Sequence, residues 1–109
     1  MRTSSLLAAL VAMIALSAPT RLPAADAAAG KAKAAACGAC HGPLGIAVAP
    51  DAPNLAGQPA MYLVEQLKAY KTGKRKHEVM TLMAKPLSNS DIENLAAWFS
   101  SLKVEVRAP

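Results

Sequence analysis

Cys37-Gly38-Ala39-Cys40-His41, the stretch CGACH, contains both cysteines of this 109-residue chain and one of its two histidines. Two residues separate the thiols, and the imidazole of His41 follows the second thiol directly. Two thiols at this spacing can reach the two vinyl groups of one porphyrin, and the next residue then lies under the iron. Cys-x-x-Cys-His is for this reason the pattern of covalent haem attachment. We therefore expect one haem c, bound through Cys37 and Cys40 and ligated by His41.

Three other uses of the cysteine pair are less favoured. A disulfide across two residues closes a tight, reducible ring that is typical of redox motifs. A thioredoxin-like enzyme carries such a pair in a strand–helix unit, and the sequence has no alternating strand pattern. A structural zinc site needs four ligands, and only His77 remains to join the trio. The haem interpretation is preferred to all three.

Residues 1–25 have the three-part layout of a secretory signal peptide. The start carries one arginine and no acid, residues 6–18 are almost entirely apolar, and small residues follow. A retained membrane anchor is the alternative, but the run is shorter than the roughly 20 residues that a span needs. We expect cleavage near Ala25 or Ala27, a mature domain of residues 26–109 in the periplasm, and no stable membrane insertion.

The predicted mature domain is small and modestly basic. Its 84 residues bury little surface, and domains of this size are usually marginal without a staple, a metal or a cofactor. Loss of Arg2 and Arg21 with the leader reduces the net charge from +5 to +3. A bound group is therefore expected to fill a core that has few aromatic side chains, namely Tyr62, Tyr70, Trp98 and Phe99.

Much of the positive charge lies in one run, Lys71, Lys74, Arg75 and Lys76. A solvated loop is the simplest interpretation of such a run. The alternative is a docking patch for acidic redox partners, since opposite charge speeds encounter. Nucleic acid is not an expected partner, because the excess of charge is small, export is predicted and no aromatic residues interleave with the run.

Helix and turn signals predict an all-α domain. Residues 27–37 are rich in Ala and Lys, which favours a short helix. Residues 42–58 hold three prolines and three glycines, which predicts a long irregular loop of the kind that often has a function. A second helix is expected from Pro59 to a stop at Gly73, and residues 74–87 are expected to form a basic loop with two methionines.

The last helix has the strongest sequence pattern. Ser88 to Asp91 resembles a capping box with a short acid in its fourth place. Apolar residues then recur at steps of three and four, which indicates an amphipathic helix: Ile92, Leu95, Ala96, Phe99 and Leu102.

Taken together, these segments resemble those of small bacterial class I monohaem cytochromes c, and one half of the dihaem periplasmic cytochromes of that group. The matching pieces occur in the expected order over nearly all of residues 30–102: CGACHG, PNLAGQ, YLVEQLKAYKTGKR, the methionine loop and LSNSDIENLAAWFSSL. The resemblance implies a class I cytochrome c fold of three to four short helices wrapped around one covalently bound haem.

The resemblance also implies a His/Met-ligated iron, with His41 as the proximal ligand. In the family, the distal ligand lies six residues before the position occupied here by Pro86, which is Met80. Met83 would then pack beside the haem, as methionines commonly do in irregular apolar spaces. Met83 and His77 are the alternative distal ligands.

Other positions receive implied roles in the same way. Pro53 matches the family residue whose carbonyl accepts the remaining N–H of the proximal imidazole, and Gly30 lies where the first and last helices cross. The chain departs from the pattern at Ala34, where relatives often carry a larger apolar residue, and Trp98 is expected to fill that space. Candidates for the haem walls or the core are Leu55, Tyr62, Leu63, Leu67, Leu95 and Trp98.

An iron with both axial positions filled by protein leaves no place for a substrate, so electron transfer rather than catalysis is expected. The main expectation is a soluble periplasmic carrier between respiratory or dehydrogenase complexes and a terminal oxidase or reductase. The alternative is a dedicated cytochrome c subunit of a periplasmic oxidoreductase, and an open-site haem enzyme or gas sensor is less favoured. The sequence does not separate carrier from subunit. For the carrier, contacts with its electron donor and acceptor are expected to be small and transient.

Overall fold

The computed structural model describes Pro19 and residues 23–109, so most of the predicted leader lies outside the described residues. The described part contains helices and no strand, which confirms the all-α prediction. None of its helices is both long and apolar enough to cross a membrane. The elements in chain order are α1 (Ala27–Lys33), the 3-10 helix η1 (Ala34–Cys37), α2 (Gly38–His41), α3 (Ala60–Thr72), α4 (Met80–Ala84) and α5 (Asn89–Ser101).

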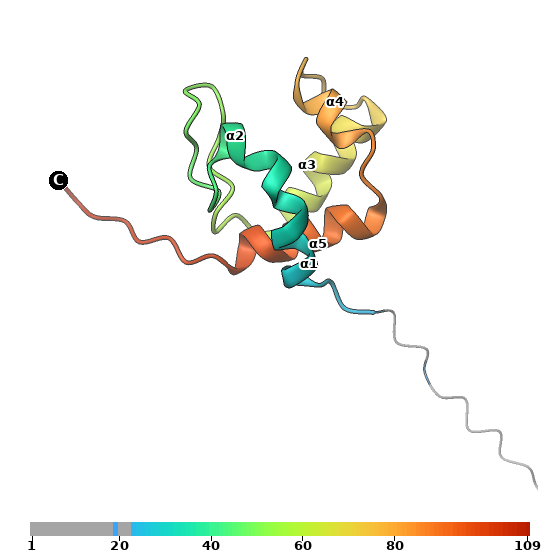
Figure 1. Ribbon diagram of the computed structural model, residues 1–109, viewed down its shortest axis with the longest axis horizontal. Helices are drawn as coiled ribbons and strands as arrows, with labels where there is room; N and C mark the ends of the chain where they lie inside the picture. Colours follow the sequence, from blue (N-terminus) through green and yellow to red (C-terminus); the bar gives the residue numbers. More distant parts are fainter. Residues whose placement is uncertain (1–18, 20–22) are drawn as a thin grey trace, which may run out of the picture.

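The elements form two groups that lie on opposite sides of the molecule, above a crossed pair of helices. Figure 1 shows α2 and the loop after it on one side, and α3 with α4 on the other. The helices α1 and α5 cross below them, and α3 also packs on α5. The cysteine–histidine motif and the methionine segment, far apart in the sequence, are therefore carried on opposite sides of one small scaffold.

The crossing of α1 and α5 depends on Gly30, which is buried. A Cβ at this position would lie 1.9 Å from the carbonyl oxygen of Asn94 and 3.0 Å from Cβ of Trp98. The backbone N–H of Asp26 donates to Oδ1 of Asn94 at 2.8 Å, which ties the start of α1 to α5. The two helices thus meet backbone to backbone, as expected for a glycine in an Ala-rich helix. Trp98 packs against the core cluster that contains Ala34.

The predicted single helix over residues 27–37 is in fact divided. Its hydrogen bonds tighten at Ala34 into η1, and α2 then carries the end of the motif. Alanine has a high helix propensity, but it does not determine whether the bonds span three or four residues. The change of pitch places Cys37 at the end of η1 and His41 at the end of α2.

The helix boundaries at the two longer helices agree with the sequence signals. The helix α3 ends at Thr72, and Gly73 follows with a φ of 79°. Ser88 and Asp91 form a complete capping box at α5, with both side chain–backbone bonds at 2.9 Å. The expected loop over residues 74–87 differs from the structure, because it contains the short helix α4. With α4 and the divided first helix, residues 23–109 contain more helical pieces than the three to four expected.

The core is small for a folded domain. Ile92 is the one large side chain among the described residues that is less than 2% exposed. Three of the eight buried apolar residues are alanines, and the full set is Ala34, Leu63, Tyr70, Ala84, Ile92, Leu95, Ala96 and Phe99.

Candidate haem site

His41 is the most constrained polar side chain of the motif. It is 7% exposed, and its Nδ1 lies 2.8 Å from the carbonyl oxygen of Pro53. A carbonyl can only accept a hydrogen bond, so Nδ1 carries the ring proton. The lone pair of the imidazole is then on Nε2, which is the atom available to bind a metal.

The loop after His41 folds back over the motif and holds Pro53 in this place. The carbonyl oxygen of Cys40 accepts hydrogen bonds from Val48 N at 3.0 Å and from Ala49 N at 3.1 Å. Asn54 Oδ1 accepts from Ala47 N at 2.8 Å. Asn54 lies in the PNLAGQ segment, and the family resemblance implied no role for it. Its position beside Pro53 was the signal, because asparagine side chains commonly bond backbone groups in loops.

Gly42 makes the sharp turn that starts this loop. Its φ of 78° lies in the left-handed region, and a Cβ there would lie 1.9 Å from the carbonyl oxygen of Ile46. Side chains are therefore excluded both by the backbone conformation and by the close approach. The glycine after CGACH allows the chain to reverse directly behind His41.

The two cysteines form no disulfide, and they differ in exposure. Cys37 is half-buried and Cys40 is exposed. Burial raises the pKa of the Cys37 thiol. A redox-active cysteine pair needs a thiol with a lowered pKa, so this shift is opposite to what the thioredoxin-like alternative requires.

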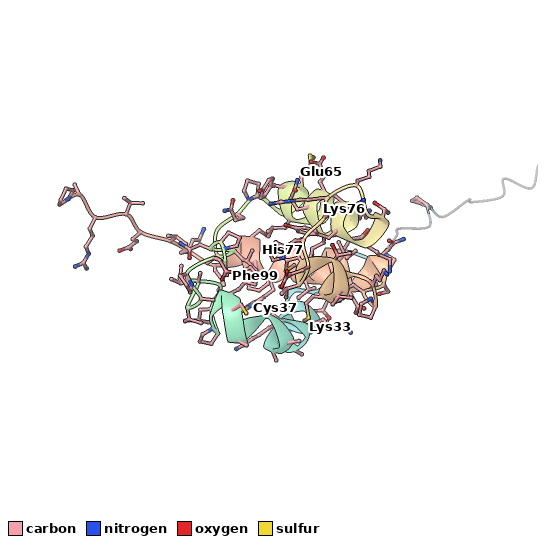
Figure 2. All side chains as sticks on the ribbon, turned by 90° about the horizontal axis from the view of Figure 1, so that it is seen from above. Lys33, Cys37, Glu65, Lys76, His77 and Phe99 are labelled. Atoms are coloured by element: carbon pink, nitrogen blue, oxygen red, sulfur yellow. The ribbon has the colours of Figure 1, made fainter. Side chains whose placement is uncertain are left out.

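The methionine segment lies on the other side of the molecule. Met80 is the first residue of α4 and is half-buried, whereas Met83 is 40% exposed. The two are three residues apart, so they share one face of the helix. Figure 2 labels Cys37 beside the early helices and His77 on the segment that leads to α4. The Nδ1 atom of His77 lies within hydrogen-bonding distance of the backbone N of Val79, at 3.2 Å.

The residues present fit a covalently held haem. The motif supplies two thiols outside any disulfide and an imidazole with an available Nε2, and α4 supplies a thioether. Large apolar side chains on α3 and α4 remain exposed, with Met61 at 75% and Leu82 at 68%. Of the suggested wall residues, Leu63 and Leu95 are buried in the core, Leu55, Leu67 and Trp98 pack against it, and Tyr62 is exposed.

The structure divides the basic run into two kinds of residue. Lys71 is half-buried, and its ammonium donates to the carbonyl oxygens of Lys85, at 3.1 Å, and Leu87. This side chain therefore ties the end of α3 to the segment between α4 and α5. A lysine with such partners has a structural role, whatever its charge contributes at a distance.

Arg75 is also engaged. Its Nη1 donates to Oε1 of Gln66 at 2.6 Å, and its guanidinium lies 4.7 Å from the centroid of the Tyr70 ring. Lys74 and Lys76 are exposed, and their side chains make no hydrogen bond within the part of the chain that the structure describes. The free cations of the run are therefore these two lysines.

Comparison with known proteins matches this geometry to one family. The family model for cytochrome c matches residues 27–103. Over 81 residues the chain is 51% identical to cytochrome c4 of Pseudomonas aeruginosa, covering 74% of this chain and 40% of that protein. It is also 51% identical to cytochrome c-554(548) of Halomonas halodenitrificans over 79 residues, covering 70% of this chain and 95% of that one. The chain thus spans less than half of the first relative and nearly all of the second.

Two further matches extend the picture. The crystal structure of reduced recombinant cytochrome c4 from Pseudomonas stutzeri superposes with a TM-score of 0.70 at 48% identity, covering 76% of this chain and 48% of that chain. A protein of Thiomonas intermedia described as a thiosulfate dehydrogenase electron acceptor is 46% identical over 72 residues, covering 65% of this chain and 33% of that protein. The helical fold, the attachment motif and these similarities agree: the chain belongs to the cytochrome c family and carries one covalently attached haem c.

Proposed function

We propose that the protein is a one-electron carrier, not an enzyme, with Cys37 and Cys40 as thioether positions, His41 as proximal ligand and Met80 as distal ligand. The bound haem supplies an iron that is reduced and oxidised by a single electron. The observation that carries the proposal is the His41–Pro53 hydrogen bond of 2.8 Å, which leaves Nε2 as the metal-binding atom of a buried imidazole.

The protein residues set how readily the electron is accepted. Donation from His41 Nδ1 to the Pro53 carbonyl makes the imidazole a stronger ligand and fixes its ring orientation. A thioether from Met80 is a softer ligand than a second imidazole, so it favours the reduced state and raises the potential. The hydrogen bonds from the 42–58 loop to the motif hold the proximal ligand in one place in both oxidation states.

Met80→Ala tests the ligand assignment. The oxidised wild-type protein should show the weak charge-transfer band of methionine ligation near the red end of its spectrum, and Met80→Ala should abolish it. Met83→Ala is the matched control, because it removes an identical side chain one turn later on the same face of α4. Loss of the band in Met83→Ala, with Met80→Ala unaffected, would transfer the ligand role to Met83.

For partner docking, Lys74 and Lys76 are the proposed contacts from the original run of four. Both ammonium groups are exposed, whereas Lys71 and Arg75 are held by neighbours within the fold. Reversing the charge at Lys74 and Lys76 should slow electron transfer with an acidic partner, most strongly at low salt. An equal effect at high and low salt would argue against electrostatic docking.

A second candidate function is that of a dedicated haem subunit. The similarity to a thiosulfate dehydrogenase electron acceptor favours a single enzyme as the electron donor. The two candidates differ on purification from the native host: a carrier elutes alone, whereas a subunit co-elutes with its enzyme. Elution in a stable complex would replace the carrier proposal with the subunit proposal.

Export to the periplasm with cleavage after Ala25 completes the proposal. The Asp26 carboxylate accepts hydrogen bonds from Ala28 N and Ala29 N and caps α1. Cleavage after Ala27 would remove this cap, so the site after Ala25 preserves the helix start. Intact-mass measurement of the exported holoprotein should give a chain that begins at Asp26, and a start at Ala28 would contradict this choice.

A further inference from the structure

The start of α4 is held by a side chain that the electron-transfer proposal does not use. Val79, directly before the helix, contributes no side-chain hydrogen bond to the helix start. The first amides of a helix have no backbone partners, so they need another acceptor. Here that acceptor is the imidazole of His77, whose Nδ1 lies 3.2 Å from Val79 N and 3.3 Å from Met80 N.

Thr81 completes the contact from the other direction. Its Oγ1 accepts a hydrogen bond from the backbone N of His77 at 3.0 Å, and its own backbone N donates to the carbonyl oxygen of His77 at 3.0 Å. His77 is therefore bonded to residues on both sides of Met80 and to the Met80 amide itself. These contacts make His77 the residue on which the segment with the proposed distal ligand is fastened.

The contact also determines which ring nitrogen of His77 carries the proton. Both backbone amides are donors, so Nδ1 is unprotonated and the proton of the neutral ring is on Nε2. In this form His77 has no free lone pair for a metal while it caps the helix. The geometry therefore separates the roles of the two residues: His77 holds the backbone, and the thioether of Met80 remains free to bind.

The other end of the segment has a different attachment. After α4, the carbonyl oxygens of Lys85 and Leu87 are held by the Lys71 ammonium. Before α4, Lys74, Lys76 and the other residues up to Val79 are exposed. The His77 contact thus supports the end of the segment next to Met80.

We propose that His77 is a positioning residue for the distal ligand: by accepting the backbone N–H of Met80, it keeps the Met80 thioether on the iron. This inference rests on the assignment of Met80 in the proposed function. It predicts that losing the acceptor at position 77 increases the fraction of molecules in which Met80 has left the iron.

The test is imidazole binding to the oxidised holoprotein, because added imidazole binds only where Met80 has dissociated. Loss of a helix N-cap weakens a helix start enough that His77→Ala should bind imidazole about fivefold more tightly than the wild type. Backbone amide exchange at Val79 and Met80 should become faster in the same variant. Thr81→Val removes the hydroxyl that accepts the His77 amide, so it should also increase the imidazole affinity, but by a smaller factor.

His77→Asn is the rescue variant. Asparagine Oδ1 is separated from Cα by the same number of bonds as histidine Nδ1, and asparagine is among the best N-cap residues. His77→Asn should therefore restore the wild-type imidazole affinity, and Glu78→Gln, a change at an exposed neighbour, should leave it unchanged. Wild-type affinity in His77→Ala, or no rescue by His77→Asn, overturns the inference.

Failure of the inference is distinguishable from failure of the proposed function. If the oxidised wild type lacks the methionine charge-transfer band, the Met80 assignment is wrong and the inference falls with it. If the wild type has the band and Met80→Ala loses it, unchanged imidazole binding in His77→Ala overturns the role of His77 alone.

Discussion

The two sides of the haem site differ in how many contacts hold each proposed iron ligand. On the proximal side, His41 is buried, its Nδ1 is bonded to Pro53, and the neighbouring Cys40 carbonyl accepts two amides from the loop. On the distal side, Met80 begins a helix of five residues and is held locally by the ring of His77. The proposed proximal ligand is thus supported by several independent contacts, and the proposed distal ligand by few.

This difference has a consequence for function. A proximal side that changes little between oxidation states keeps the haem in a fixed environment. A distal side with few supports is where substitutions adjust potential and ligand exchange without unfolding the protein. We therefore expect proximal changes to affect folding first, and distal changes to affect the spectrum first.

The largest effect should come from removing both attachment points. Cys37→Ala combined with Cys40→Ala should leave an unfolded chain, because the described core has only Ile92 as a large, fully buried side chain and the haem supplies the rest. Far-UV circular dichroism checks this prediction. A stably helical haem-free product would show that the protein core suffices by itself.

Next in size is Gly30→Ala, which disturbs the helix crossing below the motif. The added Cβ would lie 1.9 Å from the Asn94 carbonyl oxygen, and backbone cannot yield as a flexible side chain can. We expect a loss of about 3 kcal/mol in the free energy of unfolding, at the upper end for overpacking. Gly38→Ala is the matched control, since its Cβ would have its nearest neighbour at 3.8 Å. Equal denaturant midpoints for the two holoproteins would show that the close approach of α1 and α5 at Gly30 is not needed for stability.

Asn54→Ala should reduce stability by less, and it tests the loop that supports the proximal side. The substitution leaves Ala47 N without its acceptor and loosens the loop that presents the Pro53 carbonyl. Loss of one such hydrogen bond costs about 1 kcal/mol of stability, and a weaker bond to His41 should raise the redox potential slightly. A matched stability loss without any change in potential would limit Asn54 to a structural role.

The smallest effect concerns acid stability at the start of α5, where Asp91 lies in the first turn. The pKa of Asp91 is lowered from its ordinary 3.8, first by the backbone hydrogen bond of Ser88 and also by Lys33 at 3.4 Å. A lowered pKa means that the folded state binds the proton less readily than the unfolded state. This stabilisation is present above pH 3.8 and is lost as the pH falls through the folded-state value. Unfolding measured against pH should show a shallower acid loss in Asp91→Asn than in the wild type, and identical slopes would contradict the assignment.

Sequence patterns predicted much of this structure where the signal is local and repeated. The amphipathic spacing of α5, its Ser88–Asp91 box and the stop at Gly73 each depend on residues a few positions apart. The CGACH motif needs only its own five residues. The α1–α5 crossing at Gly30 was accessible through the family resemblance, because an isolated glycine in a helix gives no indication of what approaches it.

The helix α4 and the contacts of His77 and Lys71 were not predictable from local sequence patterns. A helix of five residues is too short to show a period, so the sequence predicts a loop where α4 forms. Histidine is not among the usual N-cap residues, and its role depends on which ring nitrogen faces the amides. The run from Lys71 to Lys76 shows its charge in sequence, but not that Lys71 donates to carbonyls fourteen and sixteen residues later.

The most direct test of the account is an optical redox titration of the purified protein with and without carbon monoxide. If both iron faces are closed by His41 and Met80, the titration follows a single one-electron curve, the oxidised form shows the methionine band, and carbon monoxide changes neither the reduced spectrum nor the potential. Rapid carbon monoxide binding by the reduced protein, with a matching rise in potential, would show an open distal face and contradict electron transfer through a closed site.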